Sequence, residues 1–346
     1  MNALSDQLRR RIAALCPDWD LDQVSGFIYL DGGYSNDNFR FEYAGERYVL
    51  RAPFARRGYE DRALEQYVYS AAEALHVPPV VALDTASGDM ISRWVPGQLL
   101  ADARPDGPAL ADYLRRLHSG LPAMERRHDP LTMAREHLQR ASAPAWVESL
   151  AAGLTWAPDT EVPCHNDLNP WNVICAPDGT WVTLDWEWAG RNDPLFDLVT
   201  LHQGAGLPHG DLALLAQRYL GEPADPGRLD TCLTVFWLRE TAWALAEITA
   251  GNDRAEVLEQ RDVGLEQLAR LEARALRHGF LQSGESAGLG CCSRCEADEQ
   301  FSRRAMSTSG FSANSRSPSG RACCCSASRR RSIRPSRTST VRSAPK

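Results

Sequence analysis

Lysine is nearly absent from this sequence, because Lys346 is the only one among 346 residues. Sites that hold nucleotide phosphates in kinases normally use a lysine on a strand. An arginine must therefore do this work in any such site of this chain, or the site does not function.

Long apolar runs are also missing. No stretch approaches the ~20 residues that a membrane-spanning helix needs, which excludes such a helix. Three arginines at 9–11 are followed by only four apolar residues before Cys16-Pro17, too few for a secretory signal. We therefore expect a cytoplasmic protein, and we expect the four widely spaced cysteines of residues 1–282 to be reduced thiols.

Charge is distributed unevenly along the chain. Residues 1–282 carry 26 Arg and 41 Asp or Glu, a net charge of −15, whereas residues 283–346 carry 12 Lys or Arg and 4 acids. The acidic body argues against non-specific binding of nucleic acid. Residues 283–346 are rich in Ser, Arg, Ala and Cys and lack periodicity, which predicts a disordered tail. Their six cysteines lack the two Cys-x-x-Cys pairs of a zinc ribbon.

Hydrophobic periodicity divides the body into two parts. In the first we predict helices over 1–15 and 59–75, and strands over 27–30, 38–43, 48–51, 80–83 and 90–94. After a hinge at Pro96-Gly97 we predict helices near 109–118, 131–141, 211–220, 230–250 and 255–278. The expected class is α+β, with a small antiparallel-sheet lobe over 1–95, a mainly helical lobe over 96–282 and the tail over 283–346.

One polar segment, His165-Asn166-Asp167-Leu168-Asn169-Pro170-Trp171-Asn172, is followed thirteen residues later by Asp185. An Asp can accept a hydroxyl proton, and the oxygens of Asn172 and Asp185 are hard ligands of the kind that Mg²⁺ requires. A proton-accepting Asp together with two oxygen ligands for Mg²⁺ suits phosphoryl transfer. Asp167 alone could instead cap a turn before Pro170, but three such groups in register favour the functional interpretation.

The segment resembles the His-x-Asp-Leu-x-x-x-Asn catalytic loop of kinases and its later metal-binding Asp. Over about residues 20–280 the chain resembles the aminoglycoside phosphotransferase and choline kinase superfamily. Residues 184–198 are similar to the metal segment and following helix of that superfamily, and Gly32-Gly33-Tyr34-Ser35-Asn36 resembles its phosphate loop. The resemblance implies a two-lobed protein-kinase-like fold, ATP and Mg²⁺ as cofactors, Asp167 as base, and Asn172 and Asp185 as metal ligands.

The resemblance also implies a nucleotide site in the sheet lobe. Its phosphate-binding residues would be Gly32, Gly33, Ser35 and Asn36, in a turn between two strands. Arg51 stands where kinases carry the phosphate-holding lysine, and choline-kinase-like proteins often have Arg there. Its expected ion-pair partner is Glu65, with Glu60 as the alternative. Trp94 resembles the hinge whose backbone receives adenine.

Two further residues have expected structural roles, and three are expected near the substrate. His165 would tie the catalytic loop to neighbouring backbone, and Asp197, at a predicted helix start, would stabilise that loop. Glu187 would assist the metal or attract a cationic substrate. Trp188 and Trp243 match aromatic positions that suit a quaternary ammonium group, although core packing explains each tryptophan equally well.

The sequence thus predicts a small-molecule kinase that transfers the γ-phosphate of ATP to the hydroxyl of choline, ethanolamine, thiamine or a similar cationic alcohol. Choline kinases commonly carry a second tryptophan where this chain has Ala246, which leaves the acceptor open. One alternative is an antibiotic kinase of the aminoglycoside type. Another, motivated by the absent lysine, is a nucleotide-binding module without catalysis.

Overall fold

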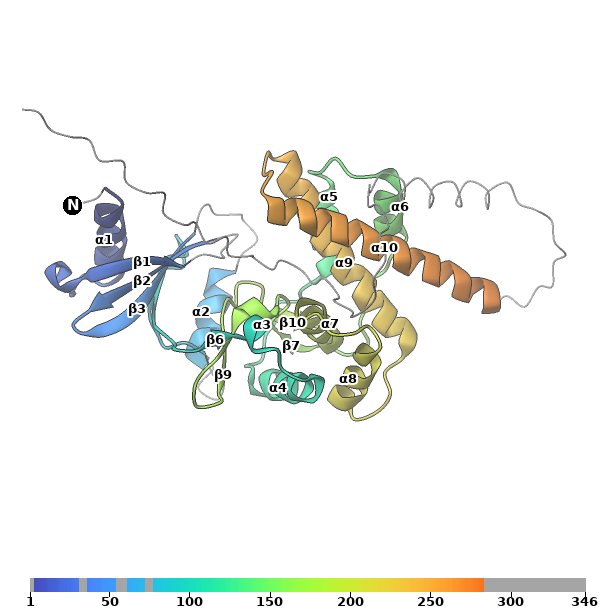
Figure 1. Ribbon diagram of the computed structural model, residues 1–346, viewed down its shortest axis with the longest axis horizontal. Coiled ribbons are helices and arrows are strands. Elements are labelled where there is room, and N and C mark those ends of the chain that lie inside the picture. The colour runs from blue at the N-terminus through green and yellow to red at the C-terminus, as the bar shows by residue number, and fades with distance from the viewer. Residues whose placement is uncertain (1–2, 31–35, 54–60, 72–76, 283–346) are drawn as a thin grey trace, which may run out of the picture.

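The N-terminal part of the computed structural model is a five-stranded antiparallel sheet with strand order β1-β2-β3-β5-β4 (Figure 1). The structure describes residues 3–30, 36–53, 61–71 and 77–282. The elements of this part are α1 (Ala3–Leu15), η1 (Leu21–Gln23), β1 (Ser25–Leu30), β2 (Asn36–Tyr43), β3 (Glu46–Pro53), α2 (Arg62–Ala71), β4 (Val80–Leu83) and β5 (Met90–Arg93).

The sheet packs against α1 through one hydrophobic cluster. Leu8 and Ile12 of α1 are buried with Phe41, Leu50 and Ile91 of the sheet. Fully burying one such side chain contributes about 1.5–3 kcal/mol. The apolar face of the predicted helix therefore joins α1 to the sheet.

Helix α2 links the two parts of the molecule. Its Val68 is fully buried within the large core of the C-terminal part, while Glu65 forms an ion pair with Arg51 of β3. This helix therefore connects β3 to the helical part through both apolar and charged contacts.

The C-terminal part is mainly helical, with α9 and α10 as two long helices packed together (Figure 1). Its elements are β6 (Gln98–Leu99), α3 (Leu100–Ala103), α4 (Gly107–Gly120), α5 (Pro130–Leu138), α6 (Ala145–Gly153), β7 (Val162–Cys164), η2 (Pro170–Asn172), β8 (Val173–Cys175), β9 (Trp181–Thr183), β10 (Gly190–Asn192), α7 (Pro194–Gly204), α8 (Asp211–Leu220), α9 (Pro226–Thr249) and α10 (Ala255–Gln282). β7 pairs with β10, and β8 pairs with both β6 and β9.

Four of these helices begin at an aspartate with a proline just after it. The carboxylates of Asp106, Asp129, Asp193 and Asp225 accept backbone N–H groups at the starts of α4, α5, α7 and α9. Such a cap typically stabilises a helix by ~1 kcal/mol, and proline pre-sets the backbone at the first turn. The cap at Asp193 fixes the start of α7, which carries Asp197.

The predicted α+β arrangement is confirmed, with two local differences. Strand β3 begins at Glu46, before the predicted start at 48, because the preceding turn is made by Ala44 and Gly45, both at positive φ. Helix α6 and the three-residue strands β7, β8 and β10 were not predicted, since such short elements carry little periodicity. The ends of the helix predicted over 59–75 lie outside the described residues. Among the described residues, no helix combines the length and apolarity needed to cross a membrane.

Candidate active site

Asp197 of α7 anchors the loop that follows β7. Its buried carboxylate accepts the backbone N–H of His165 at 2.8 Å and of Asn166 at 2.7 Å. The imidazole of His118 donates to the same carboxylate at 3.0 Å. Burial alone would raise the pKa of Asp197, but these donors, His118 first, lower it below the ordinary value. The loop is thus held by a fixed negative charge.

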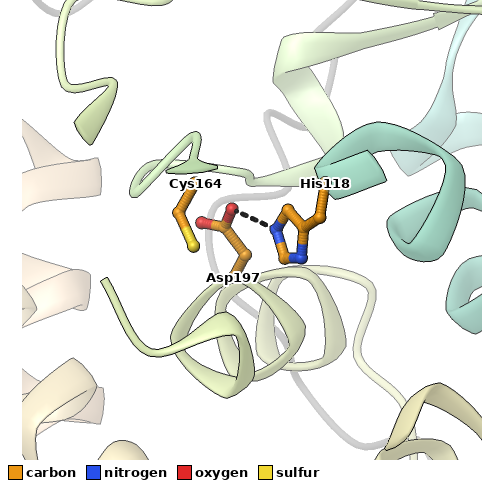
Figure 2. Close-up of side chains that lie close together, drawn as sticks. All are labelled: His118, Cys164 and Asp197. Carbon is orange, nitrogen blue, oxygen red and sulfur yellow. Dashed lines mark hydrogen bonds and ion pairs between the residues drawn. The ribbon is translucent and has the colours of Figure 1, made fainter. Parts of the chain in front are cut away.

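Figure 2 shows that His118 and Cys164 lie on either side of Asp197, close enough to suggest a metal site. The hydrogen bonds argue otherwise. The hydroxyl of Tyr219 lies 2.7 Å from His118 Nδ1, so both ring nitrogens of His118 have partners. Cys164 donates to the Asn192 carbonyl at 3.6 Å, and burial raises its pKa well above the ordinary value. These groups form a hydrogen-bonded anchor, not a set of metal ligands.

The loop residue Asn166 adopts a left-handed backbone with φ 69°, which asparagine tolerates better than most residues. Its side-chain amide donates to the carbonyls of Trp188 at 3.0 Å and Gly190 at 3.1 Å, and its oxygen accepts from Asn192 at 2.9 Å. These bonds tie the loop to the backbone that follows Asp185.

His165 makes a second tie between the two segments. Its Nε2 lies 2.8 Å from the Leu184 carbonyl, and its Nδ1 accepts the backbone N–H of Asp167 at 3.2 Å. The ring is fully buried and packs on Trp186, with centroids 4.6 Å apart. The predicted tie to neighbouring backbone is thus present as hydrogen bonds on both ring nitrogens.

Asp167 and Asn172 face one another across this loop. The Asn172 amide nitrogen donates to the Asp167 carbonyl at 3.0 Å and lies 3.5 Å from its carboxylate oxygen Oδ2. Because that nitrogen is occupied, the Asn172 oxygen is directed elsewhere and can serve as a ligand. The turn itself is capped by Asn169, whose side chain accepts from the Trp171 N–H. Capping therefore does not explain Asp167, whose side chain is 30% exposed.

Asp185 also has a positive φ, 61°. Its backbone N–H donates to the Tyr69 hydroxyl of α2 at 3.3 Å, and its Oδ1 lies 3.7 Å from Arg51 Nη1. Burial raises the pKa of Asp185 more than Arg51 lowers it. Strained backbone of this kind costs about 1–3 kcal/mol and persists only where the surroundings impose it.

A buried chain of charges joins the sheet to Asp185. Arg51 makes two bonds to Glu65, at 2.5 and 2.9 Å, and Arg62 binds Glu65 at 2.8 Å and lies 3.0 Å from Glu187. Burial opposes ionisation of both Arg51 and Glu65, but their mutual attraction raises the pKa of Arg51 and lowers that of Glu65. The ion pair that we predicted for Arg51 is thus made by Glu65; Glu60, the alternative, lies outside the described residues.

Two carboxylate oxygens in this network are suited to a divalent cation. Asp185 Oδ1 and Glu187 Oε2 are buried and accept no hydrogen bond from any described residue. Burial and the nearby Asp185 carboxylate raise the pKa of Glu187 to about 8. Buried acceptors without a donor are costly, and Mg²⁺ prefers such oxygens. The residues present therefore fit the ion. Arg62 Nη1 lies 3.0 Å from Glu187 Oε2, and the choice between metal and substrate for Glu187 stays a prediction.

The remaining predicted nucleotide residues are only partly described. Gly32, Gly33 and Ser35 lie outside the described residues. Asn36 is buried on β2, and its side-chain oxygen has no hydrogen-bond partner among the described residues. The Trp94 backbone N–H donates to the Arg47 carbonyl at 2.9 Å, so that group is already used within the sheet lobe.

The two tryptophans predicted near the substrate are half-buried. Trp188 meets the ring of His128 edge to face, with centroids 6.0 Å apart. Trp243 lies on α9 one turn after Arg239, so both residues share one face of that helix. Their part in an ammonium cage stays a prediction.

Sequence reasoning missed four residues that the fold brings to the site. They are Arg62 of α2, His118 of α4, and Arg239 and Glu240 of α9. Each makes at least one contact with a residue far away in the sequence. No local motif marks them.

A family model described as "phosphotransferase enzyme family" matches residues 27–232. The chain belongs to this family. Protein LicA of Haemophilus influenzae is 27% identical over 215 residues, which cover 55% of this chain and 62% of LicA. The chain therefore spans less than two thirds of this relative.

Two solved structures extend the comparison. A choline/ethanolamine kinase family protein from Mesorhizobium loti has 26% identity and a TM-score of 0.61, over 78% of this chain and 94% of that chain. Choline kinase LicA from Streptococcus pneumoniae has 17% identity and a TM-score of 0.62, over 78% of this chain and 100% of that chain. The predicted superfamily and protein-kinase-like fold are confirmed.

Proposed function

We propose that this protein is an ATP- and Mg²⁺-dependent kinase of a small amino alcohol of the choline class. The observation that carries the proposal is the convergence of Asp167, Asn172 and Asp185. Hydrogen bonds through His165 and Asn166 join their two segments into one unit. Asp185 in turn adjoins Arg51, in the place where other kinases have a lysine.

In this proposal each residue has a separate task. The acceptor hydroxyl oxygen attacks the γ-phosphorus of ATP, the bond from that phosphorus to the β–γ bridging oxygen breaks, and ADP leaves. Asp167 takes the hydroxyl proton. Asn172 and Asp185, with Glu187 beside them, would hold Mg²⁺, which when bound neutralises charge on the phosphates. Arg51, fixed by Glu65, and Asn36 would bind phosphate oxygens.

Support for an amino alcohol comes from the relatives and from the aromatics. The Mesorhizobium protein is described as a choline/ethanolamine kinase family member. Trp188 and Trp243 offer ring faces of the kind that attract quaternary ammonium groups. The family also contains enzymes that modify antibiotics, as the solved aminoglycoside phosphotransferases of the same fold illustrate.

A coupled assay with choline, ethanolamine, thiamine and kanamycin in parallel tests the proposal. We expect ADP release that depends on one of the three amino alcohols and on Mg²⁺. Asp167→Asn should fold normally and lose nearly all turnover. Turnover of kanamycin alone would assign the antibiotic alternative. Nucleotide binding in a thermal-shift assay, without ADP release for any alcohol, would contradict the proposal and favour the non-catalytic module.

A further inference from the structure

Arg239 of α9 reaches the catalytic loop from 72 residues away in the sequence. Its Nη1 donates to the Asn166 carbonyl at 2.6 Å, and its Nη2 donates to Asp167 Oδ1 at 3.2 Å. One planar guanidinium thus holds both the backbone before Asp167 and one oxygen of its carboxylate. The forked geometry is a property of arginine that lysine cannot reproduce.

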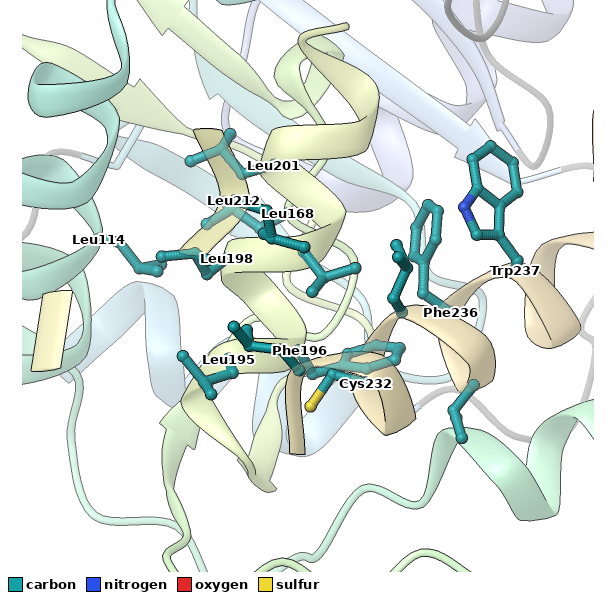
Figure 3. Close-up of a cluster of buried hydrophobic side chains, with 14 of the residues drawn as sticks. Leu114, Leu168, Leu195, Phe196, Leu198, Leu201, Leu212, Cys232, Phe236 and Trp237 are labelled. Atoms are coloured by element: carbon teal, nitrogen blue, oxygen red, sulfur yellow. The ribbon is translucent and has the colours of Figure 1, made fainter. Parts of the chain in front are cut away.

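The guanidinium is itself held rigidly. Glu240 accepts from Arg239 Nε at 3.0 Å and from Nη2 at 2.7 Å, and Gln260 of α10 donates to the other Glu240 oxygen at 2.7 Å. Arg239 is 5% exposed, and its guanidinium lies 5.2 Å from the ring centroid of Phe196 and 5.9 Å from that of Phe236. Figure 3 shows these two rings on the neighbouring helices α7 and α9.

The two oxygens of Asp167 therefore have different surroundings. Oδ1 is occupied by a strong cationic donor, whereas among the described residues Oδ2 has only the long 3.5 Å contact to the Asn172 amide. A base must have an oxygen within hydrogen-bond reach of the hydroxyl whose proton it takes. Oδ2 is the oxygen left available to meet this condition.

We propose that Arg239 is a positioning residue that fixes the carboxylate plane of Asp167 so that Oδ2 receives the proton of the acceptor hydroxyl. This inference rests on the proposed function, because it assumes that Asp167 is the base. Arg239 need not touch ATP or the acceptor. Its effect is on geometry, and a misplacement of about 1 Å at a reacting group can cost ~100-fold in rate.

Helix α9 offers a matched control in Arg228. That residue makes a two-bond ion pair with Asp193, at 2.7 and 2.6 Å, at the start of α7. It resembles Arg239 in helix, charge and partner type, but it has no described contact with Asp167. Arg228→Gln should lower the melting temperature and leave kcat within about twofold of the unaltered enzyme.

The test uses the full chain. Its acceptor is whichever member of the panel of choline, ethanolamine, thiamine and kanamycin the unaltered enzyme turns over fastest. We expect Arg239→Gln and Arg239→Lys to lower kcat by ~100-fold, with KM for ATP within about twofold, because the phosphate-binding residues are untouched. In Arg239→Ala, guanidinium chloride well below denaturing concentrations should restore part of kcat, and Arg228→Ala should show no such gain. Circular dichroism identifies any variant that does not fold.

The outcomes separate the two proposals. A folded Arg239→Lys with unchanged kcat would overturn the positioning role and leave the proposed function intact. Equal losses in kcat and in ATP affinity, without guanidinium rescue, would also overturn it and assign a general structural role. If the unaltered enzyme phosphorylates no alcohol of the panel, the proposed function fails, and this inference fails with it.

Discussion

The substitution Glu65→Gln tests the buried charge network most directly. Glu65 is fully buried and accepts three bonds from Arg51 and Arg62. A glutamine keeps one acceptor oxygen but turns an NH₂ group toward a guanidinium, and it removes the counter-charge of two buried cations. Breaking a buried ion pair by removing one partner typically costs about 3–5 kcal/mol.

The structure favours the lower end of that range. After the substitution, Asp185 still lies 3.7 Å from Arg51 and Glu187 3.0 Å from Arg62. The Glu65 charge is one cause that raises the pKa of both carboxyls, so its removal favours their ionisation beside the two cations. We therefore expect a loss of about 3 kcal/mol in the free energy of unfolding. For a domain of this size, that corresponds to a fall in melting temperature of roughly 6–12 °C.

The pH dependence gives an independent check. The pKa of Glu65 is lowered in the folded state, so its ionised form stabilises the protein above the unfolded carboxyl pKa of about 4.3. This stabilisation is lost as pH falls through the lowered folded pKa. The difference in unfolding free energy between the unaltered protein and Glu65→Gln should therefore be full at pH 7 and shrink below about pH 4.

Thermal melts at pH 7 and below about pH 4 would measure this difference in stability, with Glu46→Gln as the control. Glu46 pairs with Arg93 at 3.5 Å on the surface, with side chains 64% and 53% exposed. Exposed pairs contribute about 0–1 kcal/mol, so the control should melt within ~3 °C of the unaltered protein. A Glu65→Gln protein that melts as close as the control would refute the reasoning.

Three further predictions concern the loop anchor, the phosphate site and the thiols. Asp197→Asn should cost ~3–5 kcal/mol at pH 7, measured by urea unfolding, because a buried charge that accepts several donors is lost; a loss below 1 kcal/mol would contradict the anchor. Arg51→Lys should raise KM for ATP by ~10-fold in a coupled assay, since a lysine cannot hold its carboxylate partner through two bonds; an unchanged KM would remove this residue from the phosphate site. In a protein truncated after residue 282, a thiol reagent at pH 7 should modify only the half-buried Cys175 rapidly, because the other three thiols are buried; fast modification of all four would contradict that burial.

The motif residues could be predicted because the chemistry requires them at fixed spacing along the chain. His165, Asp167, Asn172 and Asp185 come from two segments that the sequence itself places on adjoining loops. The long helices and the sheet strands could be predicted because their apolar residues repeat with a period of 3.6 or 2.

Arg239, Arg62 and His118 could not be predicted by the same means. Each acts through a partner that only the tertiary fold brings near, and nothing in the surrounding sequence distinguishes it from a solvated charge.

The proposed phosphate-binding role of Arg51 has a practical consequence for chemical proteomics. A guanidinium stays protonated in proteins and is no nucleophile for amine-directed reagents, so activated-ester probes that label kinases at the phosphate-site lysine have no target there. The only lysine amine of the chain belongs to Lys346. Surveys that detect ATP-binding proteins by lysine acylation would therefore overlook this protein, and an arginine-directed dicarbonyl reagent would be the appropriate probe.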